Sequence, residues 1–252
     1  MRGLLTALTL AAMLSACGDA DSGGADSNSA GQTQYVLAFS WHPAFCETAP
    51  RKPECRKAVQ GGQGSRGGFS LHGLWPQPGS NTYCGVSADE METDKRGNWS
   101  ALDVPRIAEP VWQTLREIMP GTRSSLHKHE WIKHGTCYRD GDIDAYYAHS
   151  VRLMDWINVS SLTYLFDANL GRRVTGRDIR DAFERDFGKG TGDRLRIACA
   201  RDRNSGRQMI VEITLGLAGD INAATSLAPL VEASPETDPG CPDGIVDPPG
   251  FQ

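Results

Sequence analysis

The sequence predicts an α+β domain in which helices flank a mostly antiparallel sheet stabilised by disulfides. Three observations carry this prediction. Apolar residues recur at helical spacing in three segments, and short runs rich in β-branched and aromatic residues lie around them. Six cysteines remain in addition to Cys17, an even number in a chain with an export signal, which favours disulfides. The residues numbered 35–252 are enough for one domain with a substantial core.

The first seventeen residues have the features of a secretory signal. Arg2 supplies a positive charge, and the apolar run 4–14 is too short to span a bilayer. The segment ends in Leu-Ser-Ala-Cys17 rather than Ala-x-Ala, so it resembles a bacterial lipobox, with Cys17 as the lipidated first residue of the mature chain. An ordinary signal peptide with a coincidental cysteine is the alternative.

Residues 18–34 are rich in Gly, Ser, Ala, Asp and Asn and predict a flexible tether without a core. We therefore expect an exported, monomeric lipoprotein, periplasmic or at the bacterial cell surface, that touches the membrane only through a lipid anchor at Cys17. The residue directly after Cys17 is Gly18 rather than an aspartate, which favours anchoring in the outer over the inner membrane.

The elements of the domain follow from periodicity. Strands are predicted at 35–41, 194–200 and 208–217, the last two joined by a turn containing Asn204-Ser205-Gly206. Helices are predicted at about 104–118, 142–157 and 175–187. Thr175 is the expected N-cap of the last helix, with Asp178 at position N3. The tail from Glu232 onward, rich in Pro, Gly and Asp, is expected to be irregular and pinned by Cys241.

The most reactive segment is 126–137, which reads LHKHEWIKHGTC. On a helix, four potentially charged residues fall within one arc of about 140°; they are His129, Glu130, Lys133 and His134. Such a face disfavours folding, because like charges repel and buried charges need partners. The clustering is explained if this face binds an anion through its His and Lys side chains, with the Glu carboxylate orienting them or sharing a proton. A merely solvated helix face is the alternative.

A zinc site is the other alternative for this helix. The zinc pattern His-Glu-x-x-His places two imidazoles four residues apart. Here the second ligand position holds Lys133, a cation, and His134 comes one residue later. We therefore expect no metal.

A second segment, 69–76, reads FSLHGLWP. Alternating Phe69 and Leu71 predict the end of a strand, and a glycine and a proline then turn the chain, which places His72 at the strand terminus. A lone histidine there is more often structural, but a second histidine-rich segment makes an acid/base pair possible. Trp75 is either a core residue or a stacking surface for a base.

Together, the segments 69–76 and 129–137 resemble the two active-site segments of the T2 family of secreted ribonucleases, and the resemblance extends from Tyr35 to about Cys241. It implies a T2-like fold and metal-independent cleavage of single-stranded RNA without a cofactor. In that reaction the 2′-hydroxyl attacks phosphorus and leaves a 2′,3′-cyclic phosphate, so DNA is not a substrate.

The resemblance also implies roles for individual residues. We assign His134 as general base and His72 as general acid, an order that the sequence leaves open. His129 corresponds to a phosphate-binding imidazole, and Glu130 with Lys133 to groups that stabilise the transition state. Trp75 corresponds to a base-stacking residue. Gln77 stands where some members carry an aspartate facing the base, which leaves base preference open.

For the cysteines, fifteen pairings are possible in principle. The resemblance favours three of them: Cys46 with Cys55, Cys84 with Cys137, and Cys199 with Cys241.

The formal net charge of −5 argues against tight, counterion-driven storage of RNA. Phosphate affinity must then be local, and the candidate basic residues before His72 are Arg51, Lys52, Arg56, Lys57 and Arg66. A catalytically silent RNA-binding lipoprotein with the same fold is the alternative of a different class. The intact acid/base pair speaks against it, because a binding module has little need of one.

Overall fold

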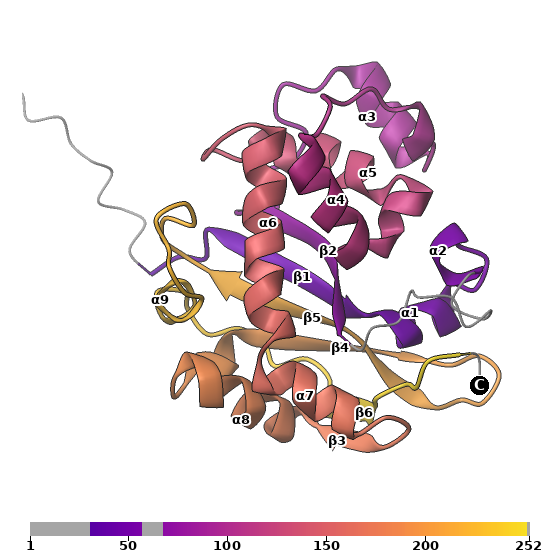
Figure 1. The fold of residues 1–252 in the computed structure, drawn as a ribbon, viewed down its shortest axis with the longest axis vertical. Helices are drawn as coiled ribbons and strands as arrows, with labels where there is room; N and C mark the ends of the chain where they lie inside the picture. The colour runs from indigo at the N-terminus through magenta and orange to yellow at the C-terminus, as the bar shows by residue number, and fades with distance from the viewer. Residues whose placement is uncertain (1–30, 57–67, 251–252) are drawn as a thin grey trace, which may run out of the picture.

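The structure is a computed structural model that describes residues 31–56 and 68–250. Within these ranges six strands form one sheet in the order β2-β1-β5-β6-β3, with β4 also paired to β5 (Figure 1). The strands are β1 (Tyr35–Trp41), β2 (Phe69–Pro76), β3 (Arg173–Thr175), β4 (Leu195–Arg201), β5 (Gln208–Leu217) and β6 (Asp243–Ile245). All of these strand pairs are antiparallel except β5 with β6, which confirms the predicted α+β class.

The helices of the described ranges lie around this sheet. They are α1 (His42–Thr48), α2 (Pro53–Arg56), α3 (Ala88–Lys95), α4 (Glu109–Ile118), α5 (Leu126–Lys133), α6 (Ile143–Asn158), α7 (Ser161–Ala168), α8 (Gly176–Phe187) and α9 (Ala228–Glu232). Helix α6 crosses one face of the sheet and packs on β1 and β2, and α3, α4 and α5 gather beside it (Figure 1). Helices α7 and α8 lie near β3 and β6 at the other end.

The three predicted helices are present, with one boundary corrected. Helix α4 begins at Glu109 rather than near residue 104, because Pro110 is accommodated only in the first helical turn, where its missing N–H is not needed. Helix α6 starts after Asp142, whose side chain accepts from two backbone N–H groups. Thr175 caps α8 in a capping box with Asp178, as predicted.

The predicted strands at 35–41, 194–200 and 208–217 correspond closely to β1, β4 and β5. The prediction of an irregular tail after Glu232 was partly wrong. Residues Asp243–Ile245 form β6, whose short length and pairing with β3 and β5 give no local periodic signal. Cys241 does pin this tail, through its disulfide to Cys199.

The core lies between the sheet and α6. Aromatic rings dominate its centre: Trp41, Phe69 and Phe166 contact one another at centroid distances of 4.7–5.4 Å. These three side chains are almost fully buried. Such packing holds β2 rigidly against its neighbours, which matters because β2 carries one of the two reactive segments.

The predicted signal segment 1–17 with Cys17, most of the tether 18–34, and the basic residues Lys57 and Arg66 lie outside the described residues. Among the helices of 31–56 and 68–250, none has the length and apolarity needed to cross a bilayer.

Candidate active site

A β-bulge in β2 presents the first reactive segment. In the pairing with β1, Ala38 faces Gly73 and Phe39 faces Leu71, so His72 is the extra residue. The strand was predicted to end at His72, but it continues to Pro76. The bulge explains why the alternation breaks there: Leu71 and Leu74 both enter the core, and His72 and Trp75 are left half-buried.

Helix α5 presents the second segment. Glu130 is buried, with 1% of its side chain exposed, and His134 caps the helix with its N–H donating to the Glu130 carbonyl. On the opposite side, Trp131 packs edge-on against Tyr146. Gly135 is required next to this anchor, because a Cβ there would lie 2.3 Å from the Trp131 ring. The predicted division into a reactive face and an anchoring face is therefore present.

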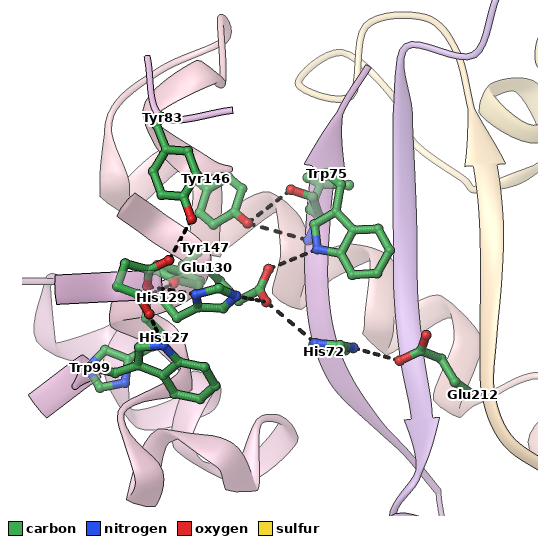
Figure 2. A network of polar contacts seen from close by, with 12 residues as sticks. His72, Trp75, Tyr83, Trp99, His127, His129, Glu130, Tyr146, Tyr147 and Glu212 are labelled. Carbon is green, nitrogen blue, oxygen red and sulfur yellow. Dashed lines mark hydrogen bonds and ion pairs between the residues drawn. The ribbon is translucent and has the colours of Figure 1, made fainter. Parts of the chain in front are cut away.

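Glu130 joins the two segments (Figure 2). Its Oε1 lies 3.5 Å from His72 Nε2 and 3.8 Å from His129 Nε2. Its Oε2 accepts a hydrogen bond of 2.9 Å from the Trp75 indole N–H. A single buried carboxylate of the second segment thus lies close to His72 and Trp75 of the first segment and to its own neighbour His129.

Burial raises the pKa of Glu130, although His72, His129, the Trp75 hydrogen bond and Lys133 all oppose the rise. The group is therefore held closer to its neutral form than an exposed carboxyl. A neutral carboxyl can donate a hydrogen bond, which an ionised one cannot.

The two histidines assigned to proton transfer are pushed in opposite directions. Burial lowers the pKa of His72, but the hydrogen bond to Glu212 and the charges of Glu130 and Glu212 outweigh it, so the net pKa is raised. Burial, with help from the Lys133 charge, lowers the pKa of His134 to about 3. This arrangement therefore favours the protonated form of His72 and the neutral form of His134.

His129 is fixed by residues that the sequence did not indicate. Its Nδ1 lies 2.7 Å from Oδ1 of Asp94, and its ring stacks on Trp99 at 4.6 Å. Asp94 is buried and also accepts a hydrogen bond of 2.8 Å from the Tyr83 hydroxyl. Asp94 lies in the charged run of α3, where nothing distinguishes it from its solvated neighbours, so sequence reasoning missed it.

Glu212 of β5 was missed as well. Its Oε2 lies 2.6 Å from Nδ1 of His72. The two residues are 140 positions apart in sequence and meet only because β1 lies between β2 and β5.

Two hollows flank the site. One, of about 200 Å³, is lined by Trp75, Pro76, Gln77, Gly79, Lys133 and His134. The other, of about 240 Å³, lies on the His72 side, and its lining includes Lys52, Trp99 and Glu212. The Lys52 ammonium sits 4.7 Å from the centre of the Trp99 ring. Of the predicted basic cluster, Lys52 therefore reaches the site, whereas Arg51 and Arg56 are exposed.

The structure contains the three disulfides that the resemblance implies: Cys46–Cys55, Cys84–Cys137 and Cys199–Cys241. The second ties the segment after β2 to the turn after α5. Beside it, the Tyr83 N–H donates to the Lys133 carbonyl at 2.9 Å. These links connect the two reactive segments covalently and through the backbone.

Within the described ranges, one group has the spacing of metal ligands: His42, Cys46 and Cys55. Its two sulfurs are joined in a disulfide, so they are not the thiolates that bind metal.

Comparison with known proteins agrees with this geometry. The model of the Ribonuclease T2 family matches residues 32–228. Ribonuclease I of Escherichia coli (strain K12) is 30% identical over 219 residues, covering 77% of this chain and 78% of that protein. A ribonuclease of Aeromonas hydrophila is 32% identical over 104 residues, covering 41% of this chain and 36% of that protein.

Solved structures show the same fold. A mutant of ribonuclease MC1 aligns with a TM-score of 0.57 and 20% identity, covering 85% of this chain and 100% of that one. RNase NT in complex with 5′-AMP aligns with a TM-score of 0.52 and 24% identity, covering 86% and 98%. The chain belongs to the ribonuclease T2 family of RNA endonucleases.

Proposed function

We propose that this protein cleaves single-stranded RNA by metal-independent transesterification, with His134 as general base and His72 as general acid. The observation that carries the proposal is the position of two imidazoles around one indole. The rings of His72 and His134 lie 5.3 Å and 5.5 Å from the ring of Trp75. Two proton-transfer groups next to one stacking surface suit a phosphodiester whose base rests on Trp75.

In the first step, neutral His134 takes the proton of the 2′-hydroxyl, whose oxygen attacks phosphorus. The bond from phosphorus to the 5′-oxygen breaks, and protonated His72 gives that oxygen its proton. The products are a 5′-hydroxyl and a 2′,3′-cyclic phosphate. Hydrolysis of the cyclic phosphate reverses the two roles, with His72 as base towards water and His134 as acid.

Negative charge accumulates on the phosphoryl oxygens in the transition state. Lys133 supplies a fixed positive charge there. Asp94 holds Nδ1 of His129, so Nε2 is the nitrogen that faces the phosphate, and in the protonated ring it is an N–H donor. Glu130, with its raised pKa, can donate a hydrogen bond in its neutral form while keeping His72 and His129 in place. Packing has already fixed these side chains in place, so no free energy is lost in ordering them during the reaction.

We propose that the hollow next to Trp75 receives the base whose ribose carries the attacking hydroxyl, because His134 lines the same hollow. Trp75 offers the stacking face, and Gln77, which also lines the hollow, offers an amide that donates and accepts. Binding assays with the four mononucleotides, compared between the unchanged chain and Gln77→Asp, would reveal which base benefits from this amide. Equal affinities in both proteins would remove Gln77 from base recognition.

We further propose that residues 35–252 are a single catalytic domain, active as a monomer and exported on the signal ending at Cys17. Three disulfides support export, since they form and persist in oxidising compartments. To test the lipid anchor, bacteria that express the chain or its Cys17→Ser variant are grown with a labelled fatty acid. The lipid anchor predicts label on the unchanged chain and none on the variant. Release of the unmodified protein without any lipid would favour an ordinary cleaved signal.

The decisive test of the reaction is incubation of the oxidised full chain with matched single-stranded RNA and DNA in EDTA, followed by analysis of the product ends. We expect cleavage of RNA only, with 2′,3′-cyclic ends, abolished by His72→Ala and by His134→Ala. Lys189→Ala, at an exposed position of the chain, is the control for substitution as such. RNA binding without cleavage across pH 4 to 8 would support the silent binding protein instead.

A further inference from the structure

We propose that Glu212 is a positioning residue for His72: it accepts the Nδ1 proton of the imidazole and thereby assigns proton transfer to Nε2. The proposal rests on the proposed role of His72 as the general acid. Nothing in the reactive segments themselves indicates it, because Glu212 lies on a different strand.

The geometry assigns different tasks to the two ring nitrogens. Nδ1 of His72 is 2.6 Å from Glu212 Oε2, a short charge-assisted contact, whereas Nε2 faces Glu130 Oε1 at 3.5 Å. An ionised carboxylate only accepts hydrogen bonds, so Nδ1 keeps its proton for as long as this contact persists. The proton that leaves and returns must then be the one on Nε2.

The sheet is built to bring these residues together. Glu212 faces Ser40 of β1, and the Ser40 hydroxyl is 3.4 Å from Glu212 Oε2. Next to it, β5 is bulged against β4: Ala198 faces Glu212 and Cys199 faces Ile210, so Val211 is the extra residue. The pair therefore comes from two bulged strands, a feature that re-aims side chains near active sites.

Folding alone gives little reason for a carboxylate at this position. Strand β5 pairs with β1 on one side and β4 on the other, and Ile210 and Ile213 of the same strand are buried in the core. Glu212 keeps only 24% of its side chain exposed. A partly buried acid in the middle of a sheet costs desolvation energy, which the contact with a protonated imidazole offsets.

The charged groups around His72 come from several elements. Strand β2 contributes no other charge, while α5 and its cap bring Glu130, Lys133 and His134. The adjoining cavity adds three titratable groups at its wall, namely His42, Lys52 and Glu54. Glu130 and Glu212 favour protonated His72, and Lys133 opposes it. Of the two carboxylates, only Glu212 hydrogen-bonds to His72 within normal distance.

The same contact serves both halves of the reaction. When His72 gives its Nε2 proton to the 5′-oxygen, the neutral ring that remains still carries Nδ1–H, held by Glu212. Its Nε2 lone pair therefore points to the position from which the proton left and can accept a proton from water when the cyclic phosphate is hydrolysed.

The first test is the pH profile of kcat/KM for Glu212→Gln in the full chain. The amide carries no charge and can either donate or accept, so it fixes neither the proton nor the tautomer. We expect the alkaline limb, where His72 loses its proton, to move down by about one pH unit, with about a tenfold loss of rate above it. Glu212→Asp keeps the charge and should restore part of the shift, and exposed Glu236→Gln should leave the profile unchanged.

The second test does not depend on activity. Titration of His72 followed by nitrogen NMR should give the Nδ1–H tautomer and a raised pKa in the unchanged chain, and a mixed tautomer with a lower pKa in Glu212→Gln. The positioning role would be overturned if folded Glu212→Gln showed the same His72 titration and the same alkaline limb of kcat/KM as the unchanged chain. That result would leave the ribonuclease reaction intact. Absence of RNA cleavage by the unchanged chain would instead refute the proposed reaction. The NMR titration would still show whether Glu212 holds the Nδ1 proton of His72.

Discussion

Gly73→Ala should disable the site without replacing any side chain that we assign to the chemistry. Gly73 lies between His72 and the core residue Leu74, at the β2 bulge. A Cβ at this position would stand 2.0 Å from Glu130 Oε2 and 2.7 Å from Trp75 Nε1. Those two atoms form the 2.9 Å hydrogen bond that joins the two reactive segments, so one methyl group would push them apart.

The size of the effect follows from these distances. Ordinary carbon contacts begin near 3.4 Å, so the Glu130 carboxyl would have to retreat by about 1.4 Å. Overpacking of this kind costs about 1–3 kcal/mol, and loss of an ordinary hydrogen bond about 0.5–1.5 kcal/mol. We expect a destabilisation of about 3 kcal/mol. Displacement of catalytic groups by about 1 Å should lower kcat/KM about a hundredfold.

The assay is denaturant unfolding combined with RNA cleavage, in the unchanged chain and in a Glu130→Ala background. Removing the carboxylate takes away the closest clash, so Gly73→Ala should cost at least about 1 kcal/mol less in that background. Equal costs in both backgrounds, or full activity of Gly73→Ala alone, would refute the reasoning. Either result would mean that β2 and α5 yield easily at this point, and that Glu130 is not held by close packing.

Two further predictions concern the base and the disulfide. Because we propose neutral His134 as the general base, kcat/KM should fall as the pH drops through about 3. Lys133→Ala should move this acidic limb to higher pH, because the Lys133 charge helps to lower the pKa of His134. A limb that stays in place, as expected for the control Lys189→Ala, would contradict this. Replacing Cys84 and Cys137 together with serine opens a loop of 53 residues, so the free energy of unfolding should drop by about 4 kcal/mol, as chemical denaturation would measure. An unchanged unfolding midpoint would show that the backbone contacts suffice.

Local patterns in the sequence were sufficient for much of the fold and for the reactive faces. The spacing of His129, Glu130, Lys133 and His134 defined one side of α5, because helical periodicity depends only on neighbouring residues. The cap of α8 by Thr175 follows equally from local hydrogen bonding. Resemblance of the two reactive segments to one family then fixed the class of enzyme.

The tertiary structure alone decided how the site is held and charged. The bulge at His72 depends on pairing with β1, and the contacts with Asp94 and Glu212 join residues far apart in the chain. The opposite pKa displacements of His72 and His134 depend on burial and on charges brought in by other elements. A sequence shows which groups can transfer protons. Which of them holds a proton at neutral pH is set by desolvation and by long-range neighbours, which exist only after folding.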